Sequence, residues 1–297
     1  TTDLSAESGI TMQVSRLSTQ SPLGRATGHT FGSLISQGQV FLLSHDGSPR
    51  LRRGFPVFIF LAGALSACAA PVVPPYETLD PGTLLTAVKG QVTFVGNVPD
   101  VQFSRIYRDS KLCGEEVLAE ELSIAEGSKG IEGVVVSLEG ITMGKPKPKE
   151  EQVVIENRSC RFSPYVATTV VGSTLEVQNT DPILHTTHAR FETRYGQTLW
   201  NVVQQGGDPG VNKTLTVPGL VDVRCDLHPN MRSFVHVFNH PYFTLTDADG
   251  RFELTNVPAG NYQLRAWHAR LGAREKPITV PARGVITSEV VMELRRQ

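Results

Sequence analysis

Short runs of alternating apolar and polar residues, separated by turn residues, extend over residues 86–294 of the chain. Alternation with a period of two is typical of strands that bury one face. The clearest runs cover residues 86–94, 134–138, 152–156, 174–178, 187–191, 213–217, 221–225, 233–238, 251–254, 262–266, 277–280 and 287–294. Turn residues recur every 8–12 residues or so, which is typical of β-sandwiches. The sequence therefore predicts an all-β protein.

The first 85 residues show no such alternation. Residues 1–50 are rich in Ser, Thr and Gly, and we interpret them as disordered, or as sequence translated ahead of a start near Leu51. A basic segment with Arg52 and Arg53 then precedes an apolar run over residues 55–67. This order is typical of a secretory signal peptide. An uncleaved membrane helix is the alternative, but it would need about 18–20 apolar residues.

The apolar run ends in Leu65-Ser66-Ala67-Cys68. These four residues resemble the lipobox of bacterial lipoproteins, and the resemblance implies that residues 51–68 form the signal and that Cys68 carries the lipid. The mature protein would then lie on the periplasmic face of a membrane, and Ala69 favours the outer membrane of a Gram-negative bacterium. Residues 69–85 read as a short, Pro-rich tether.

Length indicates the number of domains, and charge limits the kinds of partner. A chain of 297 residues is long for one domain, so two domains are expected. Its 28 Lys and Arg residues nearly balance 29 Asp and Glu residues and are scattered, which argues against a nucleic-acid partner.

The main chemical motif is Cys225-x2-His228-x2-Met231, with His185 upstream at the end of the run Asn179-Thr-Asp-Pro-Ile-Leu-His185. A thiolate, two imidazoles and a thioether are the ligands of a type 1 (blue) copper site. Zinc would gain little from the thioether. A structural cysteine with unrelated His and Met nearby is the remaining alternative.

Residues 153–238 resemble the small blue copper proteins of the cupredoxin family, and the amicyanin type most closely. The resemblance rests on Phe162-Ser-Pro164, on Val171-Gly172-Ser-Thr-Leu-Glu-Val-Gln-Asn179, on Leu184-His185 and on the Cys225–Met231 motif. It implies a Greek-key sandwich over residues 150–240 that binds one type 1 copper through His185, Cys225, His228 and Met231. It also implies that electrons pass through an exposed edge of His228, ringed by Pro182, Ile183, Leu184 and Pro229.

Further residues are expected beside the ligands rather than on the metal: Asn179, Thr186, His188 and Pro229. Thr186 stands where amicyanins have Asn, which leaves open how the ligand loop is tied. Asn230 replaces a usual aromatic residue, so we expect a weaker apolar docking surface.

Residues 246–267 resemble a carboxypeptidase regulatory-like (transthyretin-like) β-sandwich, through Asp-Gly-x-Phe-x-Leu and Val-Pro-x-Gly-x-Tyr-x-Leu. Residues 241–297 hold four expected strands, too few for an independent sandwich. We therefore expect residues 86–145 and 241–297 to form one sandwich, with the copper domain inserted between them. Two domains in sequential order are the alternative.

Two cysteines remain, Cys113 and Cys160. In an oxidising periplasm a disulfide between them is the more common state. The sequence thus predicts a membrane-anchored periplasmic copper protein, not an enzyme, that transfers single electrons to or from a redox partner protein. The alternatives are copper storage or delivery, and an adhesion or carbohydrate-binding module with a vestigial site.

Overall fold

A computed structural model describes residues 75–118, 122–149, 151–192 and 196–294. The predicted signal peptide and Cys68 lie outside these residues. Strands dominate the described part of the chain, with one four-residue α-helix and one 3-10 turn, which confirms the all-β class. The described segments include no helix of the length and apolar character that crossing a membrane requires.

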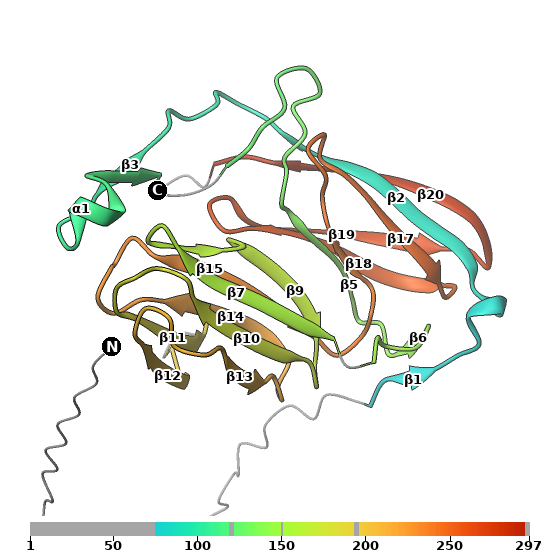
Figure 1. Cartoon of the computed structure of the whole chain (residues 1–297). Coiled ribbons are helices and arrows are strands. Elements are labelled where there is room, and N and C mark those ends of the chain that lie inside the picture. The colour runs from blue at the N-terminus through green and yellow to red at the C-terminus, as the bar shows by residue number, and fades with distance from the viewer. Residues whose placement is uncertain (1–74, 119–121, 150, 193–195, 295–297) are drawn as a thin grey trace, which may run out of the picture. The chain divides into compact units, whose positions relative to one another are not determined.

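One pair of sheets combines strands from both ends of the described chain (Figure 1). The first sheet has the order β16 (Phe243–Leu245), β5 (Val135–Glu139), β18 (Gly260–His268) and β19 (Gly272–Val280). The second has the order β17 (Arg251–Val257), β2 (Leu85–Phe94) and β20 (Arg283–Met292). The two N-terminal strands, β2 and β5, therefore lie inside sheets whose other strands all follow residue 242.

Both sheets share one hydrophobic core. Its members alternate along their strands, as the sequence pattern predicts: Val88 and Val92 from β2, Leu138 from β5 and Leu264 from β18 are all fully buried. Gly90 lies between the two valines of β2, where an added Cβ would stand 1.9 Å from the backbone oxygen of Ser288. Glycine is thus required for the close pairing of β2 with β20.

The second pair of sheets is formed by residues 152–238. One sheet has the order β13 (Val211–Thr214), β10 (Thr174–Asn179), β7 (Gln152–Arg158) and β8 (Arg161–Ser163). The other has the order β12 (Thr198–Gln204), β11 (His185–Phe191), β14 (Gly219–Arg224), β15 (Arg232–Phe238) and β9 (Val166–Val170). Pairs β10–β7 and β15–β9 are parallel, and the remaining pairs are antiparallel. Their shared core includes Ile155, Leu175, Val223 and Val235.

Short elements complete the fold. Strand β1 (Glu77–Thr78) pairs with β6 (Met143–Gly144), and the 3-10 turn η1 covers Pro81–Thr83. Strand β3 (Phe103–Arg105) pairs with β4 (Glu116–Leu118), and between them lies α1 (Ser110–Cys113). Residues 103–118, which we call the strap, come from the segment that joins β2 to β5.

A third buried cluster draws on both pairs of sheets. Phe234 and Phe238 of β15 lie with Val135 of β5 and Trp267 of β18. The rings of Phe234 and Trp267 meet edge to face, with centroids 5.2 Å apart. Such aromatic contacts are favourable beyond the apolar area that they bury.

Candidate metal centre

The predicted ligands come from two loops that meet at the same end of one sheet. Residues 180–184 connect β10 with β11, and His185 is the first residue of β11. Residues 225–231 connect the antiparallel strands β14 and β15. Because β11 and β14 are antiparallel, with His188 opposite Arg224, the start of β11 lies beside the end of β14. The hairpin that carries Cys225 therefore faces His185.

Three ligand atoms converge in the core. The Sγ atom of Cys225 lies 3.6 Å from Nδ1 of His228 and 3.9 Å from Nδ1 of His185. The three residues are exposed by 3%, 1% and 0%, respectively. Met231 is equally buried, and its N–H donates to the carbonyl of His228 at 2.9 Å. The structure thus brings the ligand atoms of His185, Cys225 and His228 together, and Met231 is buried in the same hydrophobic cluster as Cys225.

These separations suit a single metal ion. A sulfur at about 2.3 Å and a nitrogen at about 2.1 Å from one ion, at a trigonal angle, lie about 3.8 Å apart. The observed nitrogen–sulfur distances of 3.6 and 3.9 Å bracket this value. One thiolate, two imidazoles and an adjacent thioether form the donor set of type 1 copper. The residues present therefore fit copper.

A second group, Cys160, Asp181 and His185, also has its polar atoms close together. It is not a metal site of the same kind, because the sulfur of Cys160 is bonded to that of Cys113. The disulfide has a Cα–Cα distance of 5.3 Å and a sequence separation of 47 residues.

Thr186 ties the ligand hairpin to β11. Its Oγ1 accepts a hydrogen bond from the N–H of Asp226 at 2.7 Å and lies 3.7 Å from the sulfur of Cys225. Its own N–H points at the same sulfur, at 3.4 Å. The sequence left open how the ligand loop is tied, and the structure shows that Thr186 ties it.

The other residues expected near the ligands hold the loops. Asn179 donates to the carbonyls of Ile183 and Gln204, at 2.8 and 3.1 Å, and so closes the loop before His185. His188 contacts Asp226 at 2.9 Å and Thr198 at 2.8 Å, outside the ligand group.

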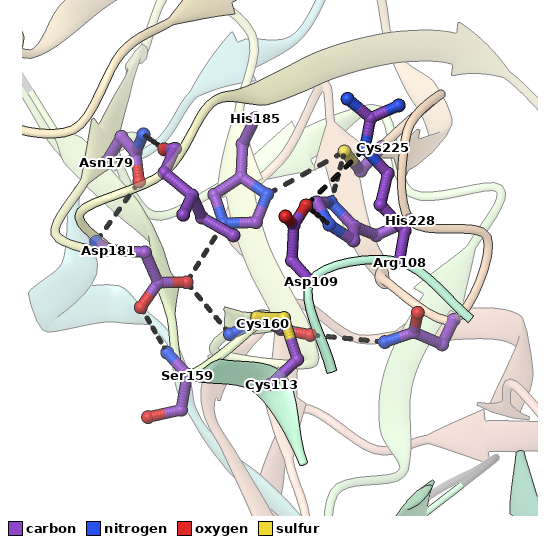
Figure 2. Close-up of a disulfide and its surroundings, with 12 residues drawn as sticks. Arg108, Asp109, Cys113, Ser159, Cys160, Asn179, Asp181, His185, Cys225 and His228 are labelled. Atoms are coloured by element: carbon purple, nitrogen blue, oxygen red, sulfur yellow. Dashed lines mark hydrogen bonds and ion pairs between the residues drawn. A yellow bond between two sulfur atoms is a disulfide. The ribbon is translucent and has the colours of Figure 1, made fainter. Parts of the chain in front are cut away.

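Asp181 positions His185 from the side opposite the sulfur (Figure 2). Its carboxylate accepts from Nε2 of His185 at 2.9 Å and from the backbone N–H groups of Ser159 and Cys160 at 2.6 and 2.8 Å. An Nε2–H bond to a carboxylate leaves Nδ1 free to bind a metal, an arrangement common in metal sites. Asp181 is within the Asn179–His185 motif, but nothing in the sequence distinguishes it as a partner of His185.

Burial and hydrogen bonding have opposite effects on the pKa of Cys225. Burial raises the pKa of the thiol, but its contacts with Nδ1 of His185, the Thr186 N–H and Nδ1 of His228 outweigh burial and lower the pKa to about 6. Burial likewise opposes the charged form of His185, and its bonds to Cys225 and Asp181 nevertheless raise its pKa. The thiolate, which is the form that binds metals, is therefore favoured near neutral pH.

The exposed edge expected for His228 is absent, which corrects the sequence prediction. The side chain of His228 is fully buried, and its Nε2 atom donates to Oδ2 of Asp109 in the strap at 3.0 Å. Pro229 is exposed, and it lines a cavity of about 320 Å³ between residues 104–108 and 227–230. Asp109 is 119 residues from His228, so no local sequence signal could have indicated this contact.

No family model matches this chain, and no curated protein matches it. Among solved structures, a purple cupredoxin from Nitrosopumilus maritimus is 23% identical, covering 30% of this chain and 99% of its own, with a TM-score of 0.25. Amicyanin from Paracoccus versutus is 22% identical, covering 30% of this chain and 83% of its own, with a TM-score of 0.26.

A copper-containing nitrite reductase from Thermus scotoductus SA-01 is 21% identical over 32% of this chain, with a TM-score of 0.28. The match spans 24% of that reductase. All three similarities cover about a third of the present chain or less, so the choice of metal rests on the donor atoms described above.

Proposed function

We propose that this protein binds one type 1 copper ion through His185, Cys225, His228 and Met231 and transfers single electrons. The observation that carries the proposal is the convergence of two Nδ1 atoms on one buried sulfur, at 3.6 and 3.9 Å, with Met231 buried beside them. Bound copper would supply a one-electron couple between its two oxidation states.

The protein's own contribution would be a cage that changes little between those states. Cu(I) and Cu(II) prefer different geometries, so ligands that cannot rearrange reduce the energy needed for electron transfer. Asp181 fixes His185, Thr186 fixes the hairpin, and burial excludes water from the thiolate. Met231, as a weakly binding thioether ligand, would tune the reduction potential.

We favour an electron carrier over a storage or delivery protein and over an enzyme. A delivery protein needs ligands that release copper readily. Here each imidazole is held in place by a hydrogen bond from its Nε2 atom to a carboxylate. A potentiometric titration of copper-loaded protein tests the choice. We expect one reversible electron, a higher potential in Met231→Leu, and loss of the couple in Cys225→Ser. Copper that instead passes rapidly to a competing chelator, without a reversible couple, would support delivery.

Location and partners are part of the proposal. We place the protein on the periplasmic face of a membrane, anchored through Cys68, with a redox protein as partner. The lipobox-like run at residues 65–68 supports the anchor. Mass spectrometry of the mature N-terminus should find a lipid-modified Cys68, and an unmodified N-terminus upstream of it would contradict the anchor.

The domain assignment is also a proposal. We assign residues 86–145 and 241–297 to a regulatory-like sandwich and residues 150–240 to a cupredoxin domain inserted in it. The placement of β2 and β5 inside sheets built from the C-terminal strands supports this division.

A further inference from the structure

The strap covers the side of His228 that faces away from Cys225. Its two strands pair Phe103 with Leu118 and Arg105 with Glu116, and Ile106 donates to the carbonyl of Glu115 at 2.8 Å. This hairpin presents residues 107–113 at its closed end. Five large apolar side chains between residues 95 and 107 are at least half exposed: Val95, Val98, Val101, Phe103 and Tyr107. Within the strap, Phe103 and Tyr107 are exposed and Ile106 is buried, so one buried side chain and specific bonds hold the strap in position.

Two bonds attach the end of the strap to the site. The disulfide joins Cys113 to Cys160, and Oδ2 of Asp109 accepts from Nε2 of His228 at 3.0 Å. Asp109 has a left-handed backbone, with φ of 55°, and its carbonyl accepts from the N–H of Cys113 at 3.0 Å. That turn aims the carboxylate at the imidazole (Figure 2).

The two ligand histidines are therefore held in the same way from opposite directions. Asp181 accepts from Nε2 of His185, and Asp109 accepts from Nε2 of His228. The disulfide links both carboxylates, because Cys113 bonds to the backbone of Asp109 and the N–H of Cys160 donates to Asp181. Asp109 is the more accessible of the two, since its side chain is 38% exposed and Asp181 is 7% exposed.

We propose that Asp109 is a positioning residue for His228 and that the strap closes the metal site to solvent. This inference rests on the proposed copper site. The carboxylate keeps the proton of His228 on Nε2, so that Nδ1 faces the sulfur, and its negative charge stabilises the more highly charged Cu(II) state. The strap takes the place that an exposed imidazole edge would occupy.

Two variants separate the charge of Asp109 from its hydrogen bond. Asp109→Asn keeps an acceptor oxygen and removes the charge, whereas Asp109→Ala removes both. Asp249→Asn is the matched control, because Asp249 is an exposed carboxylate in the turn before β17 that pairs with Arg251. Both Asp109 variants should have a higher reduction potential than the wild type, and the control should not. Asp109→Ala should also allow azide to bind Cu(II), seen as a new absorption band.

A metal-free measurement keeps this test separate from the proposed function. Nitrogen-15 NMR of the apoprotein should show His228 protonated on Nε2 in the wild type and in Asp109→Asn, and a mixture of tautomers in Asp109→Ala. If His228 is the same in all three proteins, or if the potentials of the Asp109 variants equal that of the control, the inference is wrong. If copper-loaded wild type lacks a thiolate band, the proposed function is wrong, and the apoprotein spectra alone decide the role of Asp109.

Discussion

The residues that hold the ligands are as informative as the ligands. Cys225 receives hydrogen bonds on a buried sulfur, and each ligand histidine meets a carboxylate at Nε2. A lowered thiol pKa of about 6 means that folding favours the thiolate before any metal binds. Such a site is already close to its metal-binding protonation state.

The first prediction concerns the pH dependence of this thiol. In the metal-free protein, Cys225 should lose its proton with a midpoint at about pH 6. In the unfolded chain the midpoint should be about 8.5. Because the folded pKa is the lower one, the thiolate's contribution to stability is complete above about pH 8.5 and is lost as the pH falls through 6. Thiolate absorbance against pH, with Cys225→Ser as the blank, measures this; a folded midpoint near 8.5 would contradict it.

The four candidate ligands could be selected from the sequence because three of them lie within seven residues and their types are chemically specific. The carboxylates could not. Asp181 is an ordinary loop residue until its contacts with Ser159, Cys160 and His185 are known. Asp109 reaches His228 only through tertiary structure, and that contact removes the exposed edge that the family resemblance implied.

Among the elements, β11 combines a ligand with the residue that ties the ligand loop. Thr186 and Thr187 are adjacent and both buried, but they face different surroundings. Thr186 Oγ1 accepts from Asp226, whereas Thr187 Oγ1 has no hydrogen-bond partner within the described residues. Thr187 can therefore serve as the control for Thr186.

Replacing each threonine by valine should give different results. Thr186→Val leaves the Asp226 N–H without its acceptor and should lower the free energy of unfolding by about 1–3 kcal/mol. Thr187→Val removes an unpaired buried hydroxyl and should be neutral or stabilising. Urea unfolding of the two metal-free variants measures the difference. Equal losses would show that the bond to Asp226 does not tie the loop.

Strands with alternating burial were predictable. Most of them are a few residues longer in the structure than the sequence predicted. Strand β10, for example, alternates between partly and fully buried side chains along its whole length. The edge strand β12 was not predicted, because only its last residue, Gln204, is buried. Strands β3 and β4 of the strap have no buried residue, so their pairing leaves no periodic signal.

In the whole molecule, two strands from the start of the described chain lie between strands from its end. Strand β5 lies between β16 and β18, and β2 lies between β17 and β20. A sheet that lacks its central strand loses pairing on both sides of the gap. The C-terminal strands therefore depend on strands that precede them by more than a hundred residues.

This arrangement predicts how fragments behave. Residues 241–297 alone should not melt cooperatively, because both sheets would lack a central strand. Adding residues 75–149 as a separate chain should restore a cooperative transition, whereas adding residues 150–240 should not. Calorimetry of the fragments and mixtures measures this. A cooperative transition in residues 241–297 alone would support two sequential domains instead.

We propose that a buried thiolate, two imidazoles and a thioether hold one copper ion. The most direct test is the absorption and EPR spectrum of the full chain loaded with one equivalent of Cu(II). We expect an intense thiolate-to-copper band and the narrow copper hyperfine splitting of a type 1 site, both lost in Cys225→Ser. Copper bound without a thiolate band, with a spectrum unchanged in Cys225→Ser, would contradict it.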